Sequence, residues 1–163
     1  MVEELAEQRW LPTRHAPAVE AMLSRQGIER ARLSCFVAGR DCFAVRPSSQ
    51  GSVADQWATL GWSLDVANDD RTSGAAEVLM RLGDVQAGIE PTLQIFRTCT
   101  RLIECLPALQ HDPHHPECVQ YWDVDADGMG GDDAYDALRY GLLACPGAAR
   151  GNDVAARLES WRG

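Results

Sequence analysis

Hydrophobic positions along the first part of the chain switch between helical and strand-like spacing. Residues 16–26 place apolar side chains three and four positions apart, and the glycine at position 27 predicts the end of a helix. The apolar run at residues 33–38 is typical of a buried strand. Residues 52–60 repeat the helical pattern after a serine suited to capping, and residues 62–66 predict a second strand.

The same alternation continues to residue 96. Asp69 or Asp70 begins a helix that extends to about Val85, and residues 88–91 predict a turn before a third strand at residues 93–96. Strands that are separated by helices pair in parallel, because the chain must cross over the sheet between them. The pattern therefore predicts an α/β fold.

A loop and a further helix follow. Residues 111–133 are rich in Pro, Gly, Asp and His, which is typical of a loop. Asp132 or Asp133 then begins a helix whose apolar residues share one face. The opposite face carries Asp132, Asp136 and Arg139, and we interpret Arg139 as forming only a surface pair worth under about 1 kcal/mol.

Length and composition suit one globular domain. The 163 residues are 45% hydrophobic, which is enough for one core but not for two large domains. We expect this domain at residues 1–146, followed by a tail at 147–163 with a short peripheral helix. No stretch approaches the roughly 18 apolar residues of a membrane span, and the N-terminus has no leader pattern. We therefore expect a soluble, cytosolic protein without a membrane partner.

Charge and residue types exclude several kinds of function. The chain has 24 acidic and 15 basic residues, and its net charge of -9 argues against a module that mainly grips a phosphate backbone. It does not argue against a metal-dependent nuclease, because such a site needs clustered carboxylates. The absence of Lys excludes a Walker A phosphate loop and a Schiff-base enzyme. The six cysteines form no C-x-x-C pair, so we expect reduced, buried thiols.

Acidic residues concentrate between positions 111 and 136, where eight of them occur without an Arg. Such carboxylates repel one another unless a cation or solvent separates them, and a divalent metal ion meets this need. Asp132 and Asp136 lie one helical turn apart on one face. Asp132 and Asp133 equally suit the cap of a helix, because the positive end of the helix dipole favours negative charge. Spacing alone leaves both interpretations open.

Two other metal sites fit the same stretch less well. An EF-hand calcium loop has acids at positions 1, 3 and 5, glycine at 6 and a bidentate Glu at 12. The sequence supplies the first four as Asp123, Asp125, Asp127 and Gly128, but Ala134 stands at the twelfth position. A compact zinc site would use His111, His114, His115 and Cys118. No second group of ligands elsewhere in the chain supports zinc.

Several stretches occur in an order found in one known family. Upstream they are residues 52–61, then Asn68-Asp69-Asp70-Arg71 with Gly74. Downstream they are residues 97–113, then Pro116-Glu117 and residues 132–142. Within these, Leu-Pro-Ala-Leu-Gln and Asp-Ala-Leu-Arg-Tyr are together specific. The chain resembles the C-terminal nuclease domain of tailed-phage terminase large subunits over roughly residues 16–143.

This resemblance implies a ribonuclease H-like fold in which acidic residues hold two divalent metal ions, Mg²⁺ or Mn²⁺. The implied activity is endonucleolytic cleavage of viral DNA during packaging, with the ions activating water and stabilising the leaving oxygen. The metal ligands that the chain retains would be Asp132 and Asp133, with Asp136 nearby on the same helix. Gly39 stands where the family has a second acid, and Asp41 is the candidate replacement.

The resemblance also implies what is missing. The family's ATPase domain and its strand with the first metal-binding Asp precede the region that begins at Met1. We therefore expect a truncated ribonuclease H-like sheet, mainly parallel with flanking helices, and impaired or partner-dependent cleavage. Implied partners are double-stranded viral DNA, the ATPase-containing part of terminase, the small terminase subunit and the portal protein, in the bacterial host cytoplasm. Two alternatives stay open: an inactive prophage remnant, and a small acidic metal-binding or interaction module without catalysis.

Overall fold

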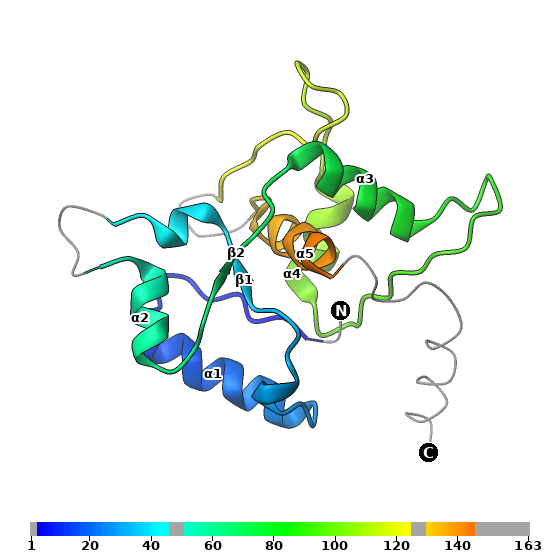
Figure 1. Cartoon of the computed structure of the whole chain (residues 1–163). Coiled ribbons are helices and arrows are strands. Elements are labelled where there is room, and N and C mark those ends of the chain that lie inside the picture. The colour runs from blue at the N-terminus through cyan, green and yellow to red at the C-terminus, as the bar shows by residue number, and fades with distance from the viewer. Residues whose placement is uncertain (1–2, 46–50, 125–129, 146–163) are drawn as a thin grey trace.

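The computed structural model describes residues 3–45, 51–124 and 130–145, which form helices around a small sheet (Figure 1). In chain order the elements, with η for short 3₁₀ helices, are α1 (Pro12–Arg25), η1 (Arg30–Arg32), β1 (Val37–Ala38), η2 (Arg40–Phe43), α2 (Val53–Thr59), β2 (Asp65–Val66), α3 (Arg71–Leu82), α4 (Thr100–Cys105), η3 (Leu106–Ala108) and α5 (Asp133–Ala144). The predicted tail at 147–163 and its helix lie outside the described residues.

Strands β1 and β2 form a two-stranded parallel sheet, in register with Val37 opposite Asp65. Helix α2 lies between them in the sequence, as a parallel connection requires. The predicted α/β class and the parallel pairing are confirmed. Each strand is two residues long, shorter than the predicted runs at 33–38 and 62–66, and residues 33–36 belong to neither a helix nor a strand.

Helix α5 runs through the middle of the molecule, in contact with α3, α4 and β1 (Figure 1). Its predicted apolar face is buried at Leu138. Its predicted polar face is buried as well, because Asp132 is 3% and Arg139 2% exposed. The exposed stripe of α5 lies elsewhere, at Asp133, Ala137 and Gly141. The prediction of a surface pair at Arg139 is therefore wrong.

Buried side chains gather in two clusters. The first packs α1 against α2; we call it the aromatic core, and it consists of Ala16, Leu23, Trp57 and Trp62. The second surrounds α5; we call it the central core, and it consists of Val78, Cys99, Leu102, Cys105, Tyr135 and Leu138. The two cores together account for most of the burial that holds the described elements in place.

The third predicted strand is not formed. Leu93 and Ile95 pack against the central core, so the segment does have the period-two pattern of a strand. Its backbone bonds differently, because the N–H groups of Thr92 and Leu93 donate to the carbonyl of Arg81 at 2.9 and 3.0 Å. Residues 93–96 therefore lie along the end of α3 and have no neighbouring strand within the described part of the chain.

Helix α4 was not predicted, and its N-terminus is stabilised from a distant part of the chain. Cys99, at the N-cap position, makes no side-chain capping bond. Instead the Glu4 carboxylate accepts the N–H groups of Arg101 at 2.8 Å and Leu102 at 3.1 Å. Because 97 positions separate Glu4 from Arg101, the local sequence carries no capping signal.

Helices α2 and α3 begin where predicted. Ser52 accepts the Asp55 N–H at 3.0 Å, and the Asp55 carboxylate accepts the Ser52 N–H at 2.8 Å, which makes a capping box. Helix α3 ends at Leu82, earlier than predicted. Gly83 has a φ of +72°, and a Cβ there would lie 2.5 Å from the Ile89 carbonyl oxygen. Only glycine fits at this position after the end of α3.

Candidate functional site

The N-terminal end of α5 carries Asp132, one of the predicted metal ligands. Asp132 occupies the N-cap position, but its side chain makes no capping hydrogen bond. Its backbone N–H donates to the Trp122 carbonyl at 2.9 Å, and its carbonyl accepts the Asp136 N–H at 2.8 Å. The hypothesis that this carboxylate serves as a helix cap is therefore wrong, and its burial needs another explanation.

The Asp132 carboxylate is buried and incompletely bonded. Burial raises the pKa of Asp132, and the negative charge of Asp136 raises it further. The nearest cation is Arg71, whose Nη2 lies 3.6 Å from Asp132 Oδ2. No hydrogen bond to Oδ2 forms within the described part of the chain. A buried carboxylate oxygen without a hydrogen bond is costly, so the site can accept a cation or a proton.

Asp136 lies one turn further along α5 and is paired with a buried arginine. Arg139 Nε donates to Asp136 Oδ1 at 2.7 Å, and the Arg139 side chain is only 3% exposed. Tyr140 donates its hydroxyl to Asp136 Oδ2 at 3.4 Å. Burial by itself lowers the pKa of Arg139, but the bond to Asp136 outweighs it and the pKa is raised. Arg139 thus stays charged inside the molecule.

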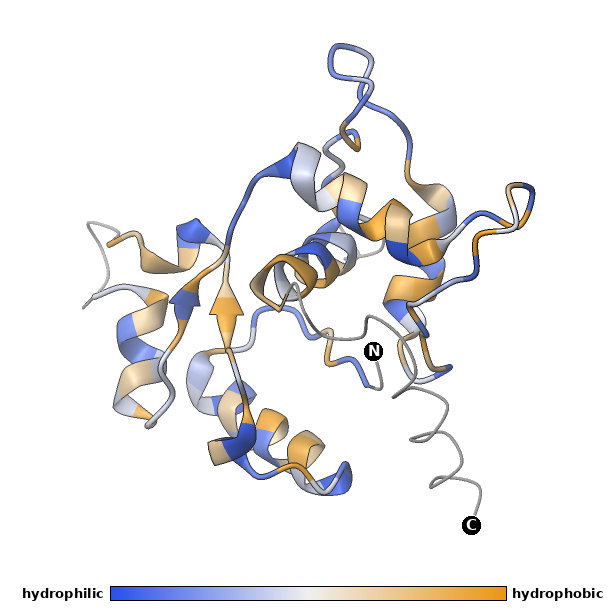
Figure 2. Ribbon diagram, turned by 45° about the vertical axis from the view of Figure 1, so that its right-hand side comes forward, coloured by the Kyte–Doolittle hydropathy of each residue, from blue (hydrophilic) through white to orange (hydrophobic). Residues whose placement is uncertain are grey.

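The N-terminal end of α3 lies against the same part of α5. Asp70 caps α3 by accepting the Ser73 N–H at 3.1 Å. Arg71 follows, and besides facing Asp132 it donates to the Val119 carbonyl at 2.7 Å. Gly74 lets the helices approach, because a Cβ at that position would lie 3.0 Å from Arg139 Cδ. Figure 2 shows that the segment leading from β2 into α3 is hydrophilic.

Asp41 and Asp133, the other two predicted ligands, are both exposed. Asp41 lies in η2, directly after β1, and its carboxylate folds back over Gly39, where a Cβ would meet Asp41 Oδ1 at 2.7 Å. The same Cβ would lie 3.6 Å from the Tyr140 hydroxyl. Burial, Asp136 and Asp41 all raise the pKa of Tyr140. Asp41 therefore lies on the Asp136 side of the site, whereas Asp133 faces solvent.

The described residues contain no group of three or more His, Cys, Asp or Glu side chains close enough to hold a metal ion. Asp132 and Asp136 are thus a pair rather than a complete cage. Mg²⁺ is usually held by one or two carboxylates together with water and substrate phosphates, so a carboxylate pair suits this ion. Water and other oxygen ligands would have to complete the coordination of an ion at this pair.

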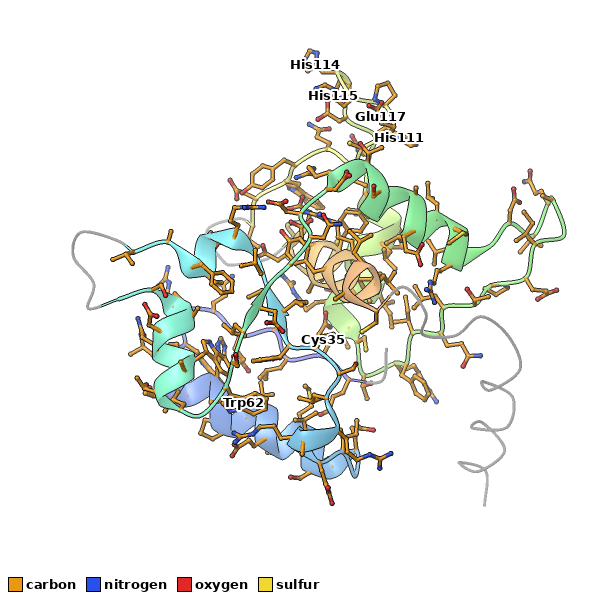
Figure 3. All side chains as sticks on the ribbon, in the orientation of Figure 1. Cys35, Trp62, His111, His114, His115 and Glu117 are labelled. Carbon is orange, nitrogen blue, oxygen red and sulfur yellow. The ribbon has the colours of Figure 1, made fainter. Side chains whose placement is uncertain are left out.

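The zinc and calcium alternatives find no support in the described residues. Figure 3 shows His111, His114 and His115 on a projecting loop, away from α5. The Cys118 Sγ lies 3.3 Å from the Thr72 hydroxyl, and the described residues place no three His, Cys, Asp or Glu side chains close enough to hold a metal ion. For calcium, the stretch 125–129 lies outside the described residues, and Asp123 accepts the Tyr121 hydroxyl at 2.7 Å.

Sequence reasoning missed the two arginines of the site. Arg71 was matched only as part of a motif, and Arg139 was interpreted as a surface residue. The sequence did carry a signal for both arginines, because each lies in a stretch that resembles the terminase family. These stretches are Asp70-Arg71 with Gly74 and the segment from Asp136 to Tyr140. What the sequence could not show is that these two segments contact each other.

Comparisons with known proteins add no further identification. No family model matches the chain, and neither the curated proteins nor the solved structures that were searched contain a match. Within the described ranges, no helix is both long enough and apolar enough to cross a membrane. The site must therefore be interpreted from its own residues.

Proposed function

We propose that this chain is the C-terminal nuclease portion of a phage terminase large subunit, with a truncated ribonuclease H-like fold. In this proposal Asp132 and Asp136 bind Mg²⁺ or Mn²⁺, and water and phosphate oxygens of DNA supply the remaining ligands. The reaction is endonucleolytic cleavage of double-stranded viral DNA during packaging, as metal-bound carboxylate sites perform it.

The contact between two motif segments carries the proposal. The segment with Arg71 and Gly74 and the segment with Asp132 and Arg139 were each assigned to the terminase family by resemblance alone. They are about 60 positions apart in the sequence, yet Arg71 Nη2 lies 3.6 Å from Asp132 and Gly74 packs on Arg139. Motif residues that meet around a buried carboxylate are typical of a functional site.

The position of the acids in the fold supports the same proposal. Asp41 lies three residues after the end of β1, and Asp69 and Asp70 lie three and four residues after the end of β2. The carboxyl ends of two parallel strands meet at one edge of a sheet, which is where α/β proteins usually bind ligands. Arg40 pairs with Asp69 across this edge at 3.1 Å. The acids at this edge and the acids of α5 thus belong to one side of the molecule.

Buried Arg139 and half-buried Arg71 neutralise the two carboxylates at which a metal ion would bind. In the metal-free protein, Arg139 supplies the positive charge beside Asp136, and Arg71 supplies it beside Asp132. A bound divalent ion would take over this role at Asp132, whose Oδ2 has no hydrogen bond in the described part of the chain. Arg71 would then be available for a phosphate group of DNA, which the guanidinium fork fits well.

The proposal is tested by Mn²⁺ binding and by nicking of supercoiled plasmid. We expect the full chain to bind Mn²⁺, measured by the loss of the free-ion electron paramagnetic resonance signal, and to nick plasmid in Mn²⁺. Asp132→Asn with Asp136→Asn should abolish both, whereas Glu29→Gln, an exposed acid on η1's N-terminal side, should leave both unchanged. If the double variant bound Mn²⁺ as well as the wild type does, the assignment of Asp132 and Asp136 as metal ligands would be wrong.

A second candidate function is an acidic interaction module without catalysis. It is favoured by the 2.7 Å pair between Arg139 and Asp136, because an arginine that already neutralises the carboxylate leaves less need for a metal. If the wild-type chain neither binds Mn²⁺ nor nicks DNA, alone or with the ATPase-containing part of terminase, this second function replaces the first.

The proposed partners follow from the proposed reaction. They are double-stranded viral DNA, the ATPase-containing part of terminase, the small terminase subunit and the portal protein, in the cytoplasm of the bacterial host. Adding the ATPase-containing part of terminase to the plasmid assay tests whether cleavage depends on that partner. Nicking that rises only in its presence means that cleavage needs acids from both chains.

A further inference from the structure

Two cysteines from opposite ends of the chain meet beside the sheet. Cys35 lies just before β1, and Cys145 directly follows α5. Their Sγ atoms are 3.1 Å apart, although 110 positions separate them in the sequence. The Ser34 hydroxyl lies 3.7 Å from the Cys145 sulfur. Figure 3 shows Cys35 near the centre of the molecule, on the segment that leads into β1.

The surroundings of this pair differ from those of the other cysteines. Cys99 and Cys105 are buried in the central core, where a small apolar side chain is required. Cys118 faces the Thr72 hydroxyl at 3.3 Å. Cys35 and Cys145 are both half-buried, so a small oxidant can reach them from solvent. The sulfur atoms would have to move about 1 Å closer to reach the usual bonded distance of about 2.05 Å.

We propose that Cys35 and Cys145 form a redox-responsive disulfide that joins β1 to the C-terminal end of α5. The oxidant is a small-molecule disulfide such as oxidised glutathione. One cysteine thiolate attacks a sulfur of glutathione disulfide and releases one glutathione thiolate. The second cysteine, after loss of its proton, attacks the mixed disulfide and releases the other. Two protein thiols are oxidised, and one glutathione disulfide is reduced to two glutathiones.

Two features of the pair set how the reaction responds to conditions. The hydrogen bond with Cys145 raises the pKa of Cys35, and burial raises it further, so Cys35 is held as the thiol at neutral pH. Oxidation should therefore accelerate as the pH rises, because only the thiolate reacts. Disulfides in reducing compartments are mostly transient and serve as redox sensors, which suits a half-buried pair of thiols.

The bond would constrain the helix that carries the candidate site. Asp132 and Asp136 lie at the start of α5, and Cys145 lies at its end. A cross-link across 110 positions removes much of the freedom of the unfolded chain. We expect the oxidised protein to melt about 10 °C higher than the reduced protein. This inference does not depend on nuclease activity, and its readouts are mass and melting temperature.

Peptide mapping of the full chain tests the proposal. The protein is equilibrated with graded ratios of oxidised to reduced glutathione, free thiols are alkylated, and peptides are identified by mass spectrometry. We expect a Cys35–Cys145 cross-linked peptide in the wild type and in Cys118→Ser, the matched control with a half-buried thiol. Cys35→Ser and Cys145→Ser should lack both the cross-link and the rise in melting temperature.

Two results would overturn the proposal. One is glutathione attached separately to Cys35 and Cys145 at every ratio, with no cross-link between them. The other is a cross-link formed mainly by other cysteines. The wild-type map decides the matter even if a serine variant fails to fold, because it identifies the bonded pair directly.

Discussion

The aromatic core and the central core differ in what they bury besides hydrocarbon. In the aromatic core the rings of Phe36, Trp57 and Trp62 pack at centroid distances of 4.9 to 6.0 Å. The buried polar residue on that side of the molecule is Ser52, and its hydroxyl is satisfied within the capping box of α2. Nothing charged is buried among the described residues there.

The buried charges lie around the central core instead. Arg81, Asp132 and Arg139 are 6%, 3% and 2% exposed. Burial of a charge is costly unless it is paired and hydrogen-bonded, so such groups persist where they have a function or a strict structural role. The contrast teaches that packing around the aromatic core needs no buried charge, whereas the helices around the central core enclose three charged side chains.

The largest expected effect sharpens this contrast. Arg139→Met should destabilise the protein by about 4 kcal/mol, because it leaves Asp136 without its buried cation. The matched control is Arg40→Met, which removes an exposed pair with Asp69 and should cost under about 1 kcal/mol. Urea unfolding measures both. A similar loss in the two variants would show that Arg139 is not a buried charge.

The next effect tests packing in the central core. Leu102 is 0% exposed, and Leu102→Ala should cost about 3 kcal/mol through lost burial and a residual cavity. Its neighbour Ile103 is 43% exposed, so Ile103→Ala on the same helix should cost under about 1 kcal/mol. Denaturant titrations followed by circular dichroism provide the comparison. Equal costs for the two changes would place Leu102 outside the core.

A glycine pair tests the approach of α3 to α5. Gly74→Ala should cost about 1 kcal/mol, because the added methyl meets Arg139 Cδ at 3.0 Å and overpacking outweighs the gain in helix propensity. Gly141→Ala, in α5 with nothing within 4 Å of its Cβ, should instead stabilise by up to about 1 kcal/mol. Thermal unfolding of both variants checks that the two stability changes have opposite signs. Stabilisation by Gly74→Ala would contradict the close approach of α3 to α5 at this position.

The smallest expected effects are on the pH dependence of stability, which should have opposite signs in the two regions. Because the pKa of Asp132 is raised, its contribution to stability is fully present below the unfolded pKa of about 3.9 and is lost as the pH rises through the folded pKa. Asp132→Asn should therefore be more stable than the wild type at pH 7 without metal. The difference should disappear below about pH 4.

Asp55 in the capping box of α2 behaves in the opposite way. Hydrogen bonds from Ser52 lower the pKa of Asp55, so its contribution is present above the unfolded pKa and is lost as the pH falls through the folded pKa. Asp55→Asn should be less stable than the wild type at pH 7, with a difference that shrinks on acidification. Melting temperatures from pH 3 to 8 test both variants. If both substitutions raised or both lowered the melting temperature at pH 7, the contrast between the two regions would be contradicted.

Much of the fold could be predicted from local pattern. The spacing of apolar residues, the cap at Ser52 and the stop at Gly61 predicted α2, and the helix–strand alternation predicted the parallel pair. The pattern at residues 93–96 was misleading, because alternation reports which side is buried but not what the backbone bonds to. Helix α4 was missed because its cap, Glu4, is far away in the sequence.

The candidate site could be predicted less completely. Asp132 and Asp136 were identified from their spacing and from the resemblance, and they do lie together at the start of α5. The partners Arg71 and Arg139 were not, since the amphipathic pattern of α5 has one apolar face and one polar face. That pattern does not tell whether the polar face meets water or a second helix.

By itself, the sequence determined α2, the starts of α3 and α5, the parallel pair of strands, the acidic stretch and the thiols, because these depend on side-chain types and on spacing within a few residues. Only the tertiary structure decided that Asp132 and Arg139 of α5 are buried, that Arg71 faces Asp132, and that Cys35 faces Cys145. The physical reason is desolvation. A carboxylate or a thiol changes its chemistry when distant segments exclude water from it, and no local pattern records which segments those are.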